Sequence, residues 1–283
     1  MQIASVRGPS SDRTVLVDES RGLAFCDELD PTFRADVTAL LDDDVYRRMA
    51  DRAATAGDEL FHPADSGLFT APYRSPRKIW GIGLNYRDHA SDLSESIPEE
   101  PASFMRGDHT IIGAGDTILL PEQSKRVTAE AEIGLVIGKY CRNVSEDEAL
   151  DYVWGVCPIL DQTAEDILQR NPRFLTRSKN FPTFFSFGPT IVPMQEVRQK
   201  FNSIEEITVS TVKNGQELRT NTVAHMTFGP AALVSFHSKV MPLFPGDIIS
   251  TGTPGAVVLD DGDIVECRIP GIGNLVNHVR REK

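Results

Sequence analysis

Two glutamates separated by one residue, followed later by an aspartate, are the side chains best suited to hold a cation. Glu130 and Glu132 stand in an alternating apolar segment typical of a β-strand, so their side chains share one face. A second apolar run, residues 154–160, ends at Asp161. Three converging carboxylates repel one another unless a positive charge lies between them. Oxygen ligands favour a hard ion, which predicts a site for Mg²⁺, Mn²⁺ or Ca²⁺. The alternative is an ordinary solvated strand face.

A candidate general base follows the apolar strand predicted over residues 79–84. His89 comes just after this strand, and Asp92 follows three residues later. On a helical turn this spacing places both side chains on one face, as a base and its orienting carboxylate require. A solvated surface pair is the alternative. The polar segment 93–101 is interpreted either as a flap over a site or as an ordinary surface loop.

Two basic side chains stand in apolar surroundings. Arg106 follows Phe104 and Met105, and Lys179 precedes an aromatic run over residues 181–187. Either can neutralise a substrate carboxylate or a developing enolate, or form a structural ion pair instead. A turn of small residues, 251–255, lets backbone N–H groups and hydroxyls approach an anion, although a plain β-turn explains it equally well.

The composition limits the class of partner. The 283 residues include 41 acidic and 29 basic side chains, giving a net charge of −12, which argues against nucleic acid or an anionic membrane surface. The four cysteines form no CxxC pair, so reduced, cytoplasmic thiols are expected. The first residues lack the basic start and apolar run of a signal peptide, and no stretch approaches the roughly 18 apolar residues of a membrane span, so neither is expected. We therefore expect a cytoplasmic protein that acts on a small molecule.

The elements that must position these residues divide into two regions. Residues 1–73 are predicted to form a small N-terminal α/β domain, with helices over 31–56 and Pro31 in a first helical turn. Residues 74–283 are predicted to form a mainly β catalytic domain. Asn214-Gly215 predicts a tight hairpin, and a Ser145-x-x-Glu148 capping box predicts a helix start. The expected fold class is α+β, mainly β.

Taken in order, the motifs resemble the fumarylacetoacetate hydrolase family over roughly residues 79–280. The resemblance implies a catalytic domain of rolled, mixed β-sheets, usually in a homodimer, and many bacterial members carry a small N-terminal domain. The segments that carry it are Gly83-Leu-Asn-Tyr-Arg-Asp-His89, Glu130-Ala-Glu132, Asp161, Lys179-Asn-Phe, Phe187-Gly-Pro189, Asn214-Gly215, Pro245-Gly-Asp247 and Gly252-Thr-Pro254.

The resemblance also implies a role for each site residue. It implies that the three acids ligate Mg²⁺ or Mn²⁺ and that His89, oriented by Asp92, is the general base. It implies that Lys179 binds substrate oxygens or steadies negative charge, and that Thr253 contacts the substrate carboxylate. The predicted metal ligands are Glu130, Glu132 and Asp161, and the predicted substrate-binding residues are Arg106, Thr253, Gly252, Gln162 and Tyr86.

The implied substrates are 2-oxo acids, often acylpyruvates, and the favoured activity is metal-dependent hydrolysis of a C–C bond in a 2,4-dioxo acid. The alternatives are decarboxylation of an oxaloacetate-type acid, and isomerisation, hydration or dehydration of a 2-oxo acid. A non-catalytic module is disfavoured because the ligand and base positions are filled.

Three residues depart from the family pattern. Asp92 stands where Glu is usual, Glu165 replaces an Arg that can help to hold substrate, and Arg106 replaces a Lys. The departures leave the metal ligands intact and the identity of the substrate open.

Overall fold

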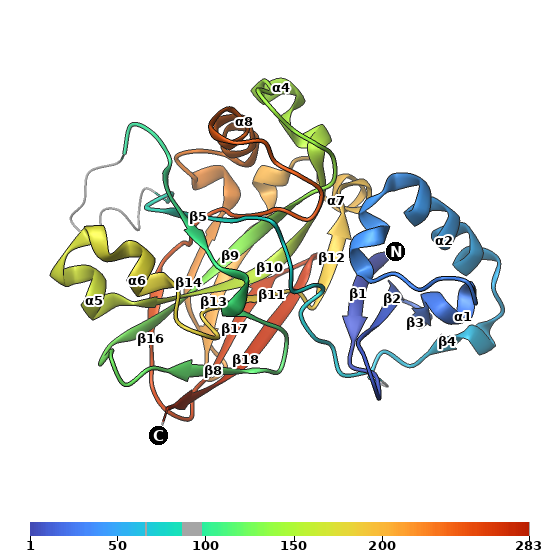
Figure 1. Ribbon diagram of the computed structural model, residues 1–283, viewed down its shortest axis with the longest axis horizontal. Coiled ribbons are helices and arrows are strands. Elements are labelled where there is room, and N and C mark those ends of the chain that lie inside the picture. Colours follow the sequence, from blue (N-terminus) through green and yellow to red (C-terminus); the bar gives the residue numbers. More distant parts are fainter. Residues whose placement is uncertain (66, 87–97, 283) are drawn as a thin grey trace.

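Two long antiparallel strands organise the chain, which was analysed as a computed structural model describing residues 1–65, 67–86 and 98–282. β9 (Val127–Ile137) and β10 (Val153–Ala164) pair along their whole length. They lie inside a large mixed sheet whose main strand order is β4-β3-β2-β1-β12-β10-β9-β15-β5-β6 (Figure 1). Strands β11, β7 and β16 join this sheet off that path, and β14-β13-β17-β18-β8 form a second sheet. The predicted fold class, α+β and mainly β, is confirmed.

The remaining elements complete these two sheets and cover them. The strands are β1 (Gln2–Val6), β2 (Arg13–Asp18), β3 (Gly22–Phe25), β4 (Phe61–His62), β5 (Ile79–Gly83), β6 (Ala102–Arg106), β7 (Ile111–Ile112), β8 (Thr117–Leu120), β11 (Phe185–Phe187), β12 (Thr190–Pro193), β13 (Thr208–Lys213), β14 (Gln216–Thr222), β15 (Ile248–Ser250), β16 (Ala256–Leu259), β17 (Ile264–Ile269) and β18 (Gly273–Arg281). The α-helices are α1 (Cys26–Leu29), α2 (Asp43–Thr55), α4 (Glu146–Ala149), α5 (Glu165–Arg170), α6 (Leu175–Lys179), α7 (Met194–Lys200) and α8 (Pro230–Val240).

The N-terminal strands continue the catalytic sheet, because β1 pairs antiparallel with β12. Beside them, α2 begins after Asp42, whose side chain accepts hydrogen bonds from two backbone N–H groups of the first turn. The helical prediction for residues 31–56 is therefore confirmed only in part. Pro31 lies outside any helix, so its placement in a first turn is wrong; the capping carboxylates are those of Asp36 and Asp42 instead. The division of the chain after residue 73 stays a prediction.

The main hydrophobic core lies on one face of β9. Ala131, Ile133 and Leu135 belong to one buried cluster with Cys267 and Leu275 of the second sheet. Because strand side chains alternate, the opposite face of β9 carries the even-numbered residues, which include the two glutamates. Helices α5 and α6 follow β10 in the chain and pack against it (Figure 1).

Short turns fix the β-strands in their places. The Asn214-Gly215 hairpin is confirmed: both residues have positive φ, 51° and 80°, and the pair joins β13 to β14. The helix start predicted at Ser145 is also confirmed, and a longer helix, α8, begins at Pro230. Within the described residues, no helix has both the length and the apolar character of a membrane span.

Candidate metal centre

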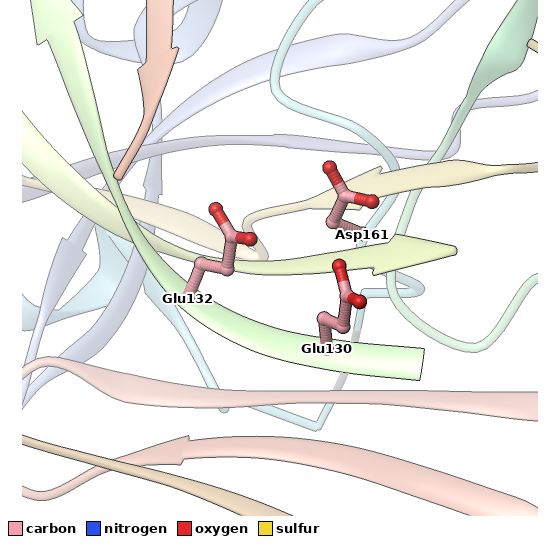
Figure 2. A group of neighbouring side chains, drawn as sticks. All are labelled: Glu130, Glu132 and Asp161. Carbon is pink, nitrogen blue, oxygen red and sulfur yellow. The ribbon is translucent and has the colours of Figure 1, made fainter. Parts of the chain in front are cut away.

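Glu130, Glu132 and Asp161 point towards one another from one face of β9 and β10 (Figure 2). The register places Glu130 directly opposite Asp161, and Glu132 lies two residues further along the same face. One carboxylate oxygen from each side chain lies within 4.8 Å of the others. Glu132 and Asp161 are buried, and Glu130 is partly buried. A compact set of buried carboxylates fits a hard divalent cation such as Mg²⁺ or Mn²⁺.

The carboxylate of Glu132 is held by the turn that follows β15. The Ser250 hydroxyl and the Gly252 N–H both donate to Glu132 Oε2, the latter at 2.8 Å. Gly252 has a φ of +97°, and a Cβ atom there would lie 2.8 Å from the Asn85 side chain, so glycine is required. Asn85 in turn donates to the Thr251 carbonyl at 2.7 Å. Among the described residues both donors bond to Oε2, so Oε1 is the oxygen available to face a cation.

Lys179, at the end of α6, brings an ammonium group into the same cluster. Its Nζ lies 2.8 Å from Glu130 Oε2 and 2.6 Å from Asp161 Oδ1. Burial by itself lowers the pKa of Lys179, but Asp161 and Glu130 outweigh burial, so the pKa lies above its ordinary value. The group is therefore a fixed positive charge at the site.

Arg106, at the end of β6, is the second buried cation. Its side chain is 0 % exposed, and its guanidinium donates to both oxygens of Asp161. It also donates to the backbone carbonyls of Gln162, at 2.9 Å, and of Lys179. Arg106 thus holds the Asp161 carboxylate and the segment that presents Lys179. Its predicted contact with substrate stays a prediction.

The other sequence-predicted residues differ in how close they come to the carboxylates. Gln162 follows Asp161, so its side chain lies on the opposite face of β10, and the structure does not bring the two side chains together. Thr253 is buried in the turn, where its hydroxyl bonds to the backbone of Gly255 at 3.2 Å. Tyr86 is fully buried, and its hydroxyl has no partner among the described residues.

Burial first, and then the charge of Glu132, raise the pKa of the Tyr86 hydroxyl. His89 and Asp92, the predicted base and its orienting acid, lie outside the described residues.

The sequence reasoning missed two residues that help to position the Glu132 carboxylate, Ser250 and Asn85. Both act through hydrogen bonds between segments far apart in the chain, and the only available signal was their position beside the strand ends at residues 84 and 251.

The metal-free cluster holds a proton on Glu132. Burial first, and then the charges of Asp161 and Glu130, raise the pKa of Glu132 to about 8. Because this pKa is higher in the folded than in the unfolded chain, the protonated group stabilises the metal-free fold fully below about pH 4.5 and ceases to do so as the pH rises through about 8. A cation must displace this proton, since ligands bind in their deprotonated form.

We therefore expect the affinity for Mn²⁺ to rise by up to about tenfold per pH unit between pH 4.5 and 8 and to level off above that range. Calorimetric titrations across this range, in two buffers with different ionisation enthalpies, will measure the affinity and the protons released. An affinity that does not change with pH, with no proton release near neutral pH, would show that Glu132 is not a ligand.

The strand pair β9 and β10 carries three carboxylates, and β6 and α6 bring the two buried cations Arg106 and Lys179 against them. This defines the class as a mainly β protein with a candidate carboxylate metal site. The chain belongs to the fumarylacetoacetate hydrolase family: residues 78–280 match the family described as fumarylacetoacetate (FAA) hydrolase C-terminal. The family resemblance found in the sequence is thus confirmed.

Known relatives cover most of the chain. It is 43% identical over 209 residues to the uncharacterized protein MJ1656 of Methanocaldococcus jannaschii, a match that covers 74% of this chain and 85% of that protein. It is 30% identical over 266 residues to the mitochondrial oxaloacetate tautomerase Fahd2a of Rattus norvegicus, covering 91% and 84%. The maleylpyruvate hydrolase of Sphingobium sp. SYK-6 superimposes with a TM-score of 0.81 at 25% identity over 100% of both chains, and it has been solved with manganese(II) and pyruvate.

Proposed function

We propose that this protein is a divalent-metal-dependent enzyme that converts 2-oxo acids of the 2,4-dioxo type by stabilising negative charge on the 2-oxo oxygen. The observation that carries the proposal is the pair of buried cations, Lys179 and Arg106, packed against the three carboxylates. Three carboxylates, one dication and these two cations leave a formal charge of about +1. Such a site attracts an anionic substrate and favours an enolate over its neutral parent.

Each described residue has a role in this chemistry. A bound Mg²⁺ or Mn²⁺ supplies Lewis acidity towards a chelating 2-oxo acid. Arg106 keeps Asp161 in place through both carboxylate oxygens. Lys179 provides a charge that is already oriented before substrate arrives, so no reorganisation is needed as the enolate forms. Ser250 and Gly252 orient Glu132 in the same way.

Keto–enol tautomerisation is the reaction that these residues support most directly, because it requires only enolate formation and the movement of a proton. The relative named as an oxaloacetate tautomerase favours it. The second candidate is hydrolytic C–C cleavage of an acylpyruvate, favoured by the relative named as a maleylpyruvate hydrolase. Hydrolysis requires in addition a base that activates water, for which we propose His89 oriented by Asp92. Decarboxylation of oxaloacetate is the remaining alternative.

One set of incubations separates these reactions. The Mn²⁺-loaded protein is mixed with acetylpyruvate and with oxaloacetate, and the enol absorbance, pyruvate and carbon dioxide are followed. Faster loss of the enol band without pyruvate indicates tautomerisation, pyruvate and acetate from acetylpyruvate indicate hydrolysis, and carbon dioxide indicates decarboxylation. If neither acid changes faster than in the presence of free Mn²⁺ alone, the proposed function is wrong.

Replacing Lys179 with methionine tests the role of the buried ammonium. We expect turnover to fall by about 10²–10³-fold, the usual effect of removing one preorganised charge-stabilising donor. Mn²⁺ binding should be retained, because the three carboxylates remain and the competing cation is gone. Turnover and calorimetric metal titration are measured on the same sample. Lys139→Met removes a surface lysine, 59 % exposed and paired with Asp43, and should leave both unchanged. Turnover equal to that of the unaltered protein would remove Lys179 from the mechanism.

A further inference from the structure

A second polar layer adjoins the carboxylates on the same face of β9 and β10. Thr128 lies two residues before Glu130, and Thr163 lies two residues after Asp161, so strand alternation places the threonine side chains on the face of the carboxylates. The register pairs Thr163 with Thr128, just as it pairs Asp161 with Glu130. The two pairs are therefore neighbouring rungs of one ladder, about 6.7 Å apart along each strand.

Both threonine hydroxyls are buried and unpartnered. Thr128 and Thr163 are each 2 % exposed, and in the part of the chain that the structure describes neither Oγ1 atom makes a hydrogen bond. Two threonines facing each other across a ladder often bond to one another, but these do not. A buried hydroxyl is costly when it is left unpaired, and native proteins pair such groups with protein, water or ligand. Two of them side by side next to the carboxylates indicate a place for an oxygen atom from outside the chain.

On the side away from the carboxylates, the charges of the described residues around this threonine pair cancel. On one side, Arg126 and Glu165 form an ion pair, and the Glu165 N–H donates to the Arg126 carbonyl at 2.9 Å. The acid and the base cancel, so this end of the face adds no net charge of its own. On the neighbouring strand β16, Val258 is the residue paired with Thr128 and is half-buried and apolar. The environment thus suits a neutral oxygen better than an additional charged group.

We propose that Thr128 and Thr163 form a subsite for a neutral oxygen, a hydroxyl or a carbonyl, on the substrate chain beyond its 2-oxo acid head. The inference rests on the proposed function and deepens it, since it assigns the recognition of the distal oxygen of the substrate to this chain's own residues. The 2-oxo acid end of the substrate lies at the carboxylates. The rest of the substrate extends to the threonine pair, which is the next pair of residues on this face of the two strands. The preferred substrates are then 2-oxo acids that carry an oxygen a few bonds further along.

The test compares the binding of matched ligands to the Mn²⁺-loaded protein by calorimetry. Oxalate has a head and no distal chain, 2-oxopentanoate has an apolar chain, and 4-hydroxy-2-oxopentanoate and 5-hydroxy-2-oxopentanoate add one hydroxyl. We expect at least one hydroxy acid to bind about five- to tenfold more tightly than 2-oxopentanoate. Thr163→Val and Thr128→Val should each remove most of this preference while oxalate affinity stays unchanged. Thr163→Ser, which restores a hydroxyl, should recover it.

The control is Thr220→Val on β14, where an exposed threonine bonds to Ser210 in the second sheet, and it should change none of these affinities. Failure of oxalate to bind the unaltered protein would count against the proposed function itself. If oxalate binds but hydroxy and parent acids bind equally, or if the valine variants keep the preference, the subsite is not at these threonines. Loss of oxalate binding in both valine variants would also overturn it, because the threonines would then support the carboxylates instead of the distal oxygen.

Discussion

Replacement of Asp161 with asparagine is expected to abolish Mn²⁺ binding and to lower turnover by about 10³-fold or more. Asp161 stands opposite Glu130 in the ladder, and it is the ligand that both buried cations contact. Without the charge of Asp161, two carboxylates face two cations, so the cluster is formally neutral and no longer attracts a dication. Loss of a Lewis acid worth several kcal/mol corresponds to a rate loss of this size. Calorimetric titration and turnover with acetylpyruvate and oxaloacetate will measure both effects.

The same substitution should also weaken the fold. Arg106 is 0 % exposed and loses the carboxylate it pairs with when Asp161 is replaced, while Lys179, 7 % exposed, keeps its pair with Glu130. Breaking a buried pair from one side costs about 3–5 kcal/mol of unfolding free energy. Glu130→Gln offers a second variant, because among the described residues Glu130 bonds through its side chain to Lys179 only, and it is less buried. It should lose metal binding with a smaller effect on stability.

Asp151→Asn is the matched control for this prediction. Asp151 is 71 % exposed and pairs with Arg198 on the surface, so stability should change by no more than about 0.5 kcal/mol and activity not at all. Full metal affinity and full turnover in both Asp161→Asn and Glu130→Gln would exclude the carboxylate cluster as the catalytic metal site.

Replacement of His89 with alanine is expected to reduce hydrolysis of acetylpyruvate by about 10²–10⁴-fold, the usual contribution of a general base. This prediction comes from the sequence, because His89 lies outside the described residues. Mn²⁺ binding should remain unchanged, since none of the three clustered carboxylates is altered. Decarboxylation of oxaloacetate should change much less, because that reaction requires the cation and no activated water. The ratio of the two rates is therefore the most informative readout.

His278→Ala provides the comparison for His89. This histidine is exposed on β18, in the second sheet, and its removal should leave both reactions at their original rates. Hydrolysis that continues undiminished in His89→Ala would exclude this residue as the base. An equal fall in both reactions, together with weaker metal binding, would show that His89 supports the metal site and does not activate water.

Much of the site could be predicted from local pattern. The alternation around Glu130 and Glu132 gives their shared face, since a period of two is a property of any strand. The apolar run before Asp161 predicts a buried strand that carries this carboxylate near its end, although β10 continues to Ala164. Lys179 was recognised as a cation beside an apolar run, and the structure confirms its burial, but among the carboxylates of Glu130 and Asp161. Each of these inferences needs only the residues next to it in the chain.

The partners across the fold could not be predicted in the same way. The opposition of Glu130 and Asp161 depends on the register of β9 against β10, and this register shifts at a bulge between Val153 and Gly155. The bonds from Ser250 to Glu132 and from Arg106 to Asp161 join strands that are distant in sequence. Gln162 is different, because strand alternation alone places a residue adjacent to Asp161 on the opposite face of β10, and its predicted role overlooked this local rule.

The central claim is that three carboxylates hold a dication that a 2-oxo acid can reach, and one crystallographic measurement tests it most directly. Crystals are soaked with Mn²⁺ and oxalate, and the anomalous scattering of manganese is mapped. We expect a single strong peak contacted by one oxygen each of Glu130, Glu132 and Asp161, at about 2.0–2.2 Å as for small hard cations, with oxalate on its open side. A map with no manganese at these carboxylates, while oxalate or manganese binds elsewhere, would contradict the account.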